Sequence, residues 1–208
     1  NLHEIIHTQI ATLSDKTILM FTDQGNAYKI DASMPPDSKF RDKGTPLNKL
    51  IPSANAEEKA VFFMELTENL LNEELLFFTK DGMIKRTAVS EYQLLKSAYQ
   101  AMKLKEDDKI IKIEYNKPNT TILFITKEGM SLNAEKSDIP IQGRISGGVK
   151  GISMTDTDRV VFVGQINKED SIIVVSNKAY SKRVNVNEID VLARYRKGVK
   201  IFDLKGDS

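Results

Sequence analysis

The stretch Leu75-Leu-Phe-Phe-Thr-Lys-Asp-Gly82 decides the fold, because its pattern occurs four times in the 208-residue chain. Each copy has four apolar residues, then Thr or Ser, then two polar residues, and then Gly or Ala. The other copies are Ile18-Leu-Met-Phe-Thr-Asp-Gln-Gly25, Ile122-Leu-Phe-Ile-Thr-Lys-Glu-Gly129 and Ile172-Ile-Val-Val-Ser-Asn-Lys-Ala179. Their starts at 18, 75, 122 and 172 lie 57, 47 and 50 residues apart. Such a period indicates an array of similar structural units.

Each copy predicts a β-hairpin. The apolar run is short and rich in β-branched and aromatic residues, which is typical of a strand buried on both faces. The polar pair and the glycine predict a tight turn, with Gly25, Gly82 and Gly129 at positive φ. Ala179 lacks that freedom, so we expect Asn177 or Lys178 to take the left-handed conformation in the fourth copy. The predicted second strands are residues 27–30, 84–87, 131–134 and 181–184.

A third and a fourth strand are expected in each repeat. A short polar stretch follows the hairpin, then a loop that is often basic, and then an apolar strand such as Lys109–Ile113 or Arg159–Val163. About four strands per repeat, at a period near 50, predict an all-β, propeller-like array. A β-sandwich would leave the repetition unexplained. We expect one domain over residues 1–208, with repeats at about 15–66, 72–115, 119–166 and 169–208.

Composition excludes several classes of site. The chain has no cysteine, so disulfides and thiolate metal sites are absent from it. His3 and His7 are too few for a zinc site, which needs three or four ligands. No apolar run reaches the roughly 20 residues that span a bilayer, and no signal peptide opens the sequence, so we expect no membrane association. With 30 basic and 29 acidic residues, only the distribution of charge can indicate a nucleic-acid partner.

The repeats resemble the C-terminal domain of the A subunit of bacterial type IIA topoisomerases, DNA gyrase and topoisomerase IV. The resemblance runs from about residue 17 to the end of the sequence. Three strings carry it, namely Leu75-Leu-Phe-Phe-Thr-Lys-Asp-Gly-Met-Ile-Lys-Arg-Thr-Ala-Val-Ser-Glu-Tyr92, Phe40-Arg-Asp-Lys-Gly-Thr-Pro-Leu47 with Leu50-Ile51, and Ser137-Asp-Ile-Pro-Ile-Gln-Gly-Arg-Ile-Ser-Gly-Gly-Val-Lys-Gly-Ile152.

The resemblance implies a β-pinwheel, a propeller-like disc whose blades exchange strands, with duplex DNA bent around its basic rim. The domain would be an accessory part of an enzyme that passes one duplex through another by means of a tyrosine in a separate domain. It implies no cofactor for this chain, whereas the parent enzyme would use ATP and magnesium elsewhere. The implied partners are duplex DNA, the rest of the A subunit and the ATPase subunit, in the nucleoid of a bacterial cytoplasm.

Two departures from the family pattern bear on this expectation. The usual domain has about five or six blades, and four repeats are visible here. Residues 1–14 look like the closing strand of an earlier blade, so we expect a fragment of a longer chain. The gyrase-specific box Gln-Arg-Arg-Gly-Gly-Lys-Gly is absent, and the nearest strings are Gln142–Gly148 and Ala193–Gly198. Its absence slightly favours topoisomerase IV over gyrase.

The basic loops of the repeats predict the DNA-binding residues. If they lie at the same point of each blade, they form an arc that neutralises phosphates and follows a bent duplex. Glycines in these loops are expected to let backbone N–H groups approach phosphate. No recognition helix is visible, so binding should depend on DNA shape and deformability rather than base sequence. The candidates are Lys39, Arg41, Lys43, Lys85, Arg86, Lys96, Arg144, Lys150, Lys182, Arg183, Arg194, Arg196 and Lys197.

Sorting of charge along the sequence supports these candidates over ordinary solvated loops. Residues 178–200 hold seven basic and two acidic residues, a net charge of +5, whereas residues 57–74 hold one basic and six acidic, a net charge of −5. This predicts a binding edge and a repelling side. The loop Lys96–Gln100 has one charge and no glycine, so we expect the weakest contact in the second repeat.

The sequence indicates no catalytic site. Tyr92 and Tyr180 fall at positions where packing explains them, and Tyr195 stands between two arginines where it could contact sugar or phosphate. None has the activating base and metal-binding carboxylates that strand cleavage needs. Asp107-Asp108 lies in a predicted tight turn. A propeller hydrolase would need inward carboxylates where the repeats place apolar residues, which leaves a protein-interaction propeller as the alternative to DNA binding.

Overall fold

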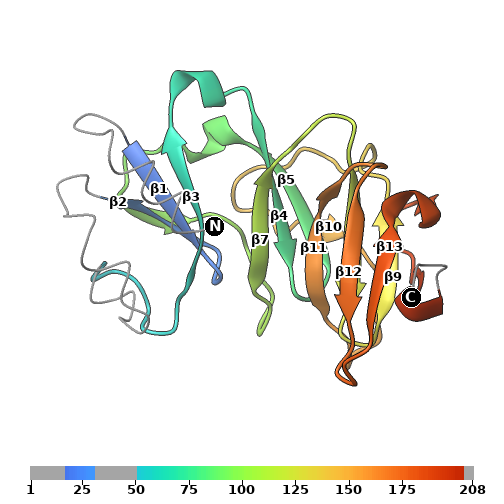
Figure 1. The fold of residues 1–208 in the computed structure, drawn as a ribbon. Helices are drawn as coiled ribbons and strands as arrows, with labels where there is room; N and C mark the ends of the chain where they lie inside the picture. Colours follow the sequence, from blue (N-terminus) through green and yellow to red (C-terminus); the bar gives the residue numbers. More distant parts are fainter. Residues whose placement is uncertain (1–16, 31–50, 204–208) are drawn as a thin grey trace.

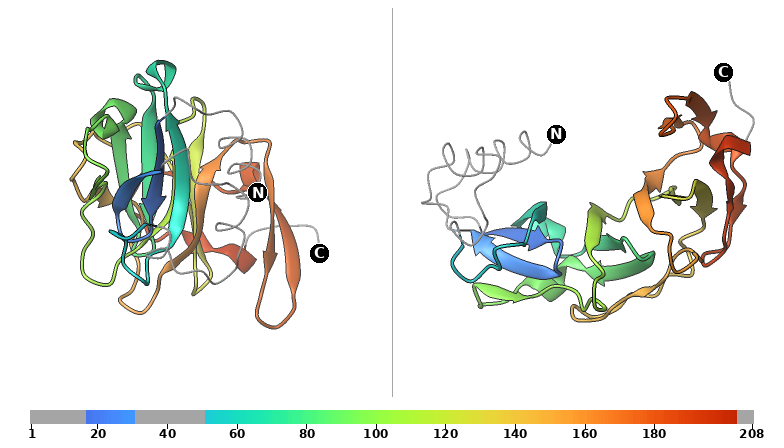
Figure 2. Two further views of the ribbon diagram at one scale, coloured as in Figure 1. Left: turned by 90° about the vertical axis from the view of Figure 1, so that its left-hand side faces the viewer. Right: turned by 90° about the horizontal axis from the view of Figure 1, so that it is seen from below.

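The structure is a computed structural model that describes residues 17–30 and 51–203, and its regular elements are β-strands and short 3-10 helices (Figure 1). The strands form two four-stranded sheets, a five-stranded sheet and a two-stranded sheet. The right-hand view of Figure 2 shows the sheets following one another along an open arc. The short 3-10 helices are η1 (Glu68–Leu70), η2 (Val89–Tyr92), η3 (Val186–Glu188) and η4 (Ile201–Asp203).

The structure confirms the four predicted hairpins. In each of them the two strands are antiparallel neighbours. The pairs are β1 (Thr17–Thr22) with β2 (Asn26–Ile30), β4 (Glu74–Thr79) with β5 (Met83–Ala88), β8 (Thr121–Thr126) with β9 (Met130–Ala134), and β12 (Ser171–Val175) with β13 (Ser181–Asn185).

The hydroxyl residue of the repeated pattern closes each turn. In all four hairpins its Oγ accepts a hydrogen bond from the backbone N–H four residues on, at 3.4, 3.1, 3.2 and 3.2 Å in chain order. Gly25, Gly82 and Gly129 have φ values of +79°, +85° and +83°, as predicted. The prediction for the fourth turn was wrong, because Ala179 itself takes the left-handed conformation at φ +63°. Its N–H donates to the Ser176 carbonyl at 3.1 Å, so the hydrogen bonds of the turn hold Ala there.

A third strand returns beside the first strand of three hairpins. The return strands are β3 (Ala60–Leu66), β7 (Ile110–Tyr115) and β11 (Val160–Ile166), which pair antiparallel with β1, β4 and β8. Two of them also bond to the turn of the preceding repeat. The Ile110 N–H donates to the Asp23 carbonyl at 2.9 Å, and the Val160 N–H donates to the Lys80 carbonyl at 2.8 Å.

The following repeat supplies the last strand of each of these three sheets. Strand β6 (Ala98–Gln100) pairs with β2, β10 (Val149–Lys150) with β5, and both β14 (Val191–Leu192) and β15 (Val199–Lys200) with β9. The same hydrogen bond recurs at each junction, because the carbonyl of Gly25, Gly82 or Gly129 accepts the N–H of Ala101, Gly151 or Ile201 at 2.7, 2.7 and 2.8 Å. This exchange of strands confirms the predicted β-pinwheel.

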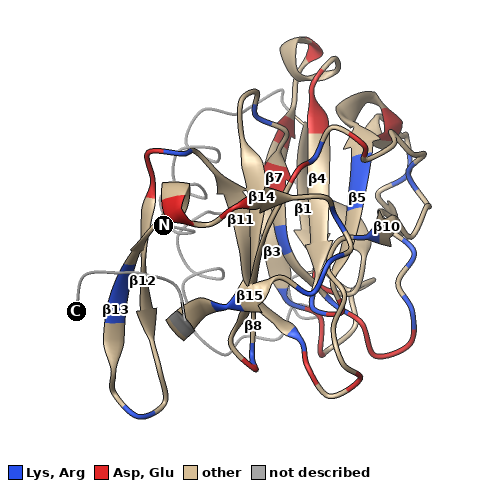
Figure 3. Cartoon of the chain, turned by 90° about the vertical axis from the view of Figure 1, so that its right-hand side faces the viewer, with Lys and Arg blue, Asp and Glu red and all other residues tan. Residues whose placement is uncertain are grey.

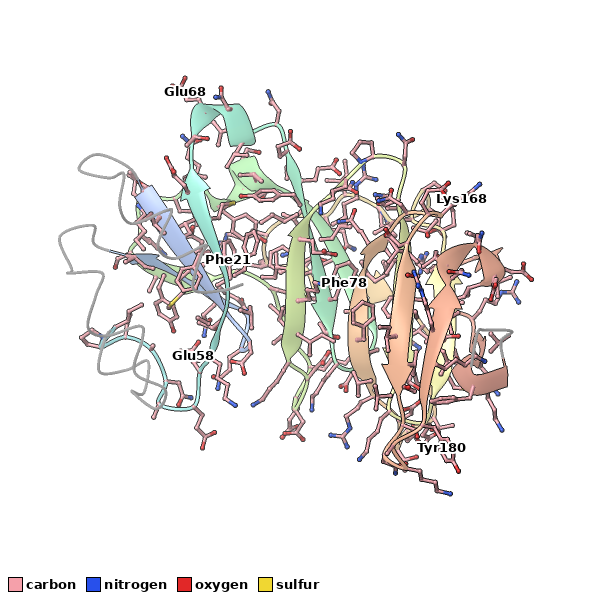
Figure 4. All side chains as sticks on the ribbon, in the orientation of Figure 1. Phe21, Glu58, Glu68, Phe78, Lys168 and Tyr180 are labelled. Atoms are coloured by element: carbon pink, nitrogen blue, oxygen red, sulfur yellow. The ribbon has the colours of Figure 1, made fainter. Side chains whose placement is uncertain are left out.

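The core lies between successive hairpins. Phe21 contacts Phe77 of the next hairpin edge to face, with ring centroids 6.0 Å apart, and Phe78 meets Phe124 in the same way at 6.4 Å. Figure 4 shows Phe21 and Phe78 inside the molecule. Large apolar side chains of the first three hairpins are therefore buried against the repeat that follows.

The fourth hairpin departs from the prediction of burial on both faces. Ile173 and Val175, on β12, are 74% and 67% exposed. The residues aligned with Val175 are Phe21, Phe78 and Ile125, each of which packs against the following hairpin. No hairpin follows β13 among the described residues. Tyr180 was expected to pack but is 70% exposed at the tip of this hairpin (Figure 4). Tyr92, in contrast, is buried as expected.

Candidate nucleic-acid interface

Three segments carry the exchanged strands, and we call residues 92–103, 139–153 and 191–200 the exchange segments. They contain eight basic residues and no acidic residue. A stretch of chain this one-sided is unusual in a protein whose net charge is only +1. The basic residues are Lys96, Lys103, Arg144, Lys150, Arg194, Arg196, Lys197 and Lys200.

The exchange segments contact one another in turn. The Lys103 N–H donates to the Ser146 carbonyl at 3.3 Å, which joins the first segment to the second. The Tyr195 N–H donates to the Gly151 carbonyl at 2.7 Å, and the Ser153 N–H to the Arg196 carbonyl at 3.0 Å, which join the second to the third. Figure 3 shows basic loops beside β10 and β15, and acidic segments at the upper end beside β4 and β7. Backbone hydrogen bonds therefore link the three segments on which the predicted arc of basic residues lies.

Two glycines of these segments, Gly148 and Gly198, lie tightly against the neighbouring blade. Gly148 and Gly198 have φ values of +80° and +75°. A Cβ on them would lie 2.4 Å from the Ile84 carbonyl oxygen and 1.9 Å from that of Ser131. The Gly148 N–H is already bonded to the Ser146 hydroxyl at 3.2 Å. Gly148 and Gly198 therefore serve the close approach of the exchanged strand, and for the other glycines of these segments the contact with phosphate stays a prediction.

Lys85 is removed from the DNA-binding set, because its side chain is 0% exposed. Its ammonium donates to the Tyr92 hydroxyl at 3.0 Å, to the Ala101 carbonyl at 2.6 Å and to the Arg144 carbonyl. It also lies over the Phe77 ring at 4.7 Å. Burial, and secondarily the Arg144 guanidinium, lower the pKa of Lys85 to about 7. Lys85 thus holds two exchange segments together.

Arg86 is largely neutralised. Its guanidinium makes two hydrogen bonds to the Glu74 carboxylate, at 2.6 and 3.0 Å, and a third to the Ile139 carbonyl at 3.1 Å. The Arg86 hydrogen bond lowers the pKa of Glu74, so the pair stays ionised. The Arg86 side chain is still 26% exposed, so its contact with DNA stays a prediction beside this structural role.

Arg144 and Arg194 occupy the same position of successive segments and both bind backbone. Arg144 donates to the Gln100 carbonyl and lies over the Tyr99 ring at 5.4 Å. Arg194 donates to the Lys150 carbonyl at 2.9 Å and forms an ion pair with Asp138 at 3.2 Å. Both arginines order the segments while keeping part of their surface exposed.

The remaining candidates are more accessible. Lys96, Lys150, Arg183, Arg196 and Lys197 are exposed, and Lys182 is half-buried. Lys150 reaches the Tyr195 hydroxyl at 3.1 Å, Lys182 the Phe202 carbonyl at 3.1 Å, and Arg183 the Ser171 hydroxyl at 3.2 Å. Within the described residues, the side chains of Lys96, Arg196 and Lys197 have no ion pair or hydrogen bond, so they are the cations best placed to meet a phosphate.

Comparison with known proteins places the chain in a family. The model described as "DNA gyrase C-terminal domain, beta-propeller" matches residues 16–50, 73–115, 120–167 and 170–208. The chain belongs to the DNA gyrase C-terminal domain family. The A subunit of DNA gyrase from Staphylococcus epidermidis is 33% identical over 205 residues, covering 96% of this chain and 23% of that protein. The A subunit of DNA topoisomerase 4 from the same species is 28% identical, covering 96% of this chain and 24% of that protein.

Solved structures of the gyrase C-terminal domain family have the same fold. The crystal structure of the C-terminal domain of DNA topoisomerase IV has a TM-score of 0.78 at 26% identity, and covers 89% of this chain and 58% of that one. The structure of the DNA gyrase A C-terminal domain has a TM-score of 0.65 at 21% identity, and covers 90% of this chain and 60% of that one. At this level of identity the comparison supports a shared fold only. The chain spans about a quarter of the length of the curated relatives it matches.

Three of the predicted DNA-binding residues are not placed by the structure, and two basic residues of the exchange segments were not predicted. Lys39, Arg41 and Lys43 lie outside the described residues. Sequence reasoning missed Lys103 and Lys200, although Lys200 pairs with Met130 as Lys150 pairs with Met83. The recurrence of a lysine at intervals of 50 residues was the signal that could have found it.

Some of the acidic side chains of residues 57–74 are buried or paired within the protein. Glu58 is buried and accepts hydrogen bonds from the Thr22 and Tyr28 hydroxyls at 2.8 and 2.7 Å. Its pKa is lowered by these and other hydrogen bonds, although burial acts in the opposite direction. With Glu74 bound to Arg86, the exposed acids of this stretch are Glu57, Glu68 and Glu73. The repelling side is therefore weaker than the sequence count suggested.

No metal site emerges from the described residues. The Asp108 N–H donates to the Lys105 carbonyl at 3.1 Å, which confirms the predicted turn. The Asp108 carboxylate accepts the N–H groups of Asp81 and Lys109 at 3.1 and 2.8 Å. No group of three or more His, Cys, Asp or Glu in the described part of the chain could hold a metal ion. None of its helices is long and apolar enough to cross a membrane.

Proposed function

We propose that this chain binds duplex DNA along the exchange segments and bends it, without reading base sequence, as an accessory domain of the A subunit of a type IIA topoisomerase. One observation supports the proposal most: eight basic residues and no acidic residue lie on three segments that contact one another in turn. A continuous cationic rim releases counterions from the DNA backbone on binding, which drives affinity whatever the sequence.

The shape of the arc favours bending. The described sheets curve along an open arc (Figure 2). A duplex whose phosphates follow the rim of this arc has to bend. Among the described elements there is no α-helix to enter a major groove. Binding therefore depends on the backbone and on how easily the duplex deforms. The enzyme's chemistry, with its ATP and magnesium, would belong to other domains, and this chain would supply no catalytic group.

The proposed partners follow from the family. They are duplex DNA, the remainder of the A subunit and the ATPase subunit, in a bacterial cytoplasm. Relatives carry the names of both gyrase and topoisomerase IV. The sequence lacks the string Gln-Arg-Arg-Gly-Gly-Lys-Gly, and for this reason the proposal slightly favours topoisomerase IV. The four repeats form one pinwheel domain in this proposal.

The salt dependence of DNA binding tests the proposal. Replacing Arg196 and Lys197 with alanine removes two exposed charges that hold no partner in the described structure. The slope of log affinity against log salt should become smaller by about 2, because each phosphate contact contributes about 0.9. The slope is measured by fluorescence anisotropy or gel shift with a duplex of about 150 base pairs, near the persistence length of DNA.

A matched control removes the same charge elsewhere. Lys117 and Lys168 are exposed lysines in the turns between repeats, outside the exchange segments, and Figure 4 labels Lys168. The double variant Lys117→Ala/Lys168→Ala should keep the wild-type slope. Equal slopes for both double variants would move the site off the exchange segments. No retention of DNA at about 50 mM salt, where phosphate contacts are strong, would remove the function from this chain.

A protein-interaction scaffold is the second candidate, and one observation favours it. Ile173 and Val175 on β12 lie near Val161 and Phe162 of β11 around an apolar groove, and all four side chains are exposed. Apolar patches of this kind mark contacts with other protein surfaces. If the chain retained the rest of the A subunit but no DNA at low salt, this candidate would replace the first.

A further inference from the structure

The three exchange segments share one position at which each exposes a large apolar side chain, and two of them also expose others, among them Ile141 and Val191. Leu95 is 100% exposed, Ile145 56% and Tyr195 46%. They stand five residues before Gln100, Lys150 and Lys200, which pair with the first residue of β2, β5 and β9 respectively. We call these three side chains the apolar row. Single exposed hydrophobic residues are ordinary, but one that recurs every 50 residues on a cationic rim calls for a ligand.

Basic residues flank every member of the apolar row. Lys96 follows Leu95, Arg144 precedes Ile145, and Arg194 and Arg196 flank Tyr195. Leu95 and Ile145 line one groove of about 630 Å³ together with Lys96, Tyr99 and Arg144. Carboxylates are also present: Glu91 Oε2 accepts the Arg144 N–H at 3.2 Å, and Asp81, Asp156 and Asp158 line a second groove with Tyr195 and Lys150. A polyanion with apolar surface between its charges fits these surroundings better than an acidic or neutral protein does.

Tyr195 is held outward by its neighbours. Its φ of +63° is a left-handed conformation that non-glycine residues rarely adopt. The N–H bond to the Gly151 carbonyl and the Lys150 ammonium, which lies over the ring at 4.8 Å and donates to the hydroxyl, fix the side chain at the rim. Such local strain persists only where the surroundings impose it. The ring is therefore presented to solvent in a set orientation.

We propose that the apolar row inserts into the minor groove of the bound duplex, where Leu95, Ile145 and Tyr195 partly unstack base pairs and kink the DNA toward the rim. This inference rests on the proposed function and supplies its bending mechanism. Apolar wedges beside basic residues kink DNA in this way, and burial of the wedge and added phosphate contacts offset the cost of unstacking. Pyrimidine–purine steps such as TpA unstack most easily, so the wedges should settle there.

A triple variant separates kinking from charge. Leu95→Ser/Ile145→Ser/Tyr195→Ser removes the row, retains every basic residue and changes exposed positions only. We expect the salt slope of DNA binding to stay at the wild-type value, because no phosphate contact is lost. Two other signals should be lost: the rise in fluorescence of 2-aminopurine placed beside TpA steps, and the increase in ligase-mediated circles from a duplex of about 150 base pairs, whose ends rarely meet unless the DNA is bent.

The control variant Val161→Ser/Ile173→Ser/Val175→Ser removes three exposed apolar side chains outside the exchange segments and should match the wild type in DNA binding, 2-aminopurine fluorescence and circle formation. Unstacking and circle formation that persist in the row variant would overturn the inference. A wild-type chain that binds with a steep salt slope but never raises 2-aminopurine fluorescence would overturn it while leaving the proposed function standing. If the row variant kinked DNA normally but no longer bound the rest of the A subunit, the row would be a protein contact and the inference would be wrong.

Discussion

At the scale of single residues, Gly198 shows how little room an exchange junction leaves. Gly198 and Gly129 both have positive φ, but a Cβ on Gly198 would lie 1.9 Å from the Ser131 carbonyl oxygen, whereas one on Gly129 would meet nothing within 4 Å. We predict that Gly129→Ala lowers the free energy of unfolding by about 1–2 kcal/mol, which is the cost of placing a non-glycine residue in the left-handed conformation. Gly198→Ala should lower it by much more, because the added Cβ also clashes with Ser131. Urea unfolding measures both, and equal losses would show that β15 moves away from β9 freely.

Lys85 predicts a pH dependence of stability. Its pKa of about 7 in the folded protein is below the value of about 10.4 for an unfolded lysine. Between these values the unfolded chain binds more protons, so the contribution of Lys85 makes unfolding harder as pH rises from 7 to 9, and adds no slope below 7. Above this window, tyrosines with raised pKa such as Tyr99 act in the opposite direction.

The variant Lys85→Met isolates this effect. It leaves the Ala101 and Arg144 carbonyls without the lysine, so we expect lower stability at every pH. The informative quantity is the slope of unfolding free energy against pH between 7 and 9, measured by denaturant titration. This slope should be smaller in the variant than in the wild type, and identical slopes would show that Lys85 stays charged in the folded protein.

At the scale of elements, the ion pair between Arg194 and Asp138 limits the charge that the third exchange segment can offer. Asp138 lies just before the second exchange segment, and its side chain is 55% exposed. We predict that Asp138→Asn strengthens DNA binding and steepens the salt slope by up to about 1, because Arg194 becomes available to a phosphate. Glu169→Gln, which removes one exposed charge from the turn before β12, is the control. Equal effects would indicate general repulsion instead.

Elements also show what the sequence could and could not predict. The hairpins were predictable because apolar runs and turn residues act locally, and the hydroxyl of Thr or Ser closes the turn in all four. The exchange of strands was expected from the family resemblance, but the positions of the exchanged strands were not predictable, since β10, β14 and β15 are two residues long and form only where a neighbouring sheet offers an edge. Lys85 was misjudged because lysine is usually exposed. Its alignment with Tyr28 and Leu132, both buried, was the missed signal.

At the scale of the whole molecule, each of the three larger sheets takes its last strand from the stretch of chain that follows it. Residues 169–208 supply β14 and β15 to β9, and Val184, Ile189 and Ile201 pack against Leu123. We predict that deleting 169–208 lowers the amide protection of β9 while β2, which receives β6, keeps its own. Hydrogen exchange with mass spectrometry measures both strands. Unchanged protection of β9 would mean that the third sheet is stable without its borrowed strands.

The recurrent bond from a turn carbonyl to the next repeat has a consequence for how such genes change length. The bonded residues lie 76, 69 and 72 positions apart, from Gly25 to Ala101, Gly82 to Gly151 and Gly129 to Ile201. Duplication or loss of one whole period, wherever recombination cuts, still leaves a hairpin followed at this distance by an exchange segment. The contact between a hairpin turn and the following exchange segment can therefore form again at every interior repeat of the recombinant protein. Unequal crossing-over can lengthen or shorten the array in single blades without inventing a new interface.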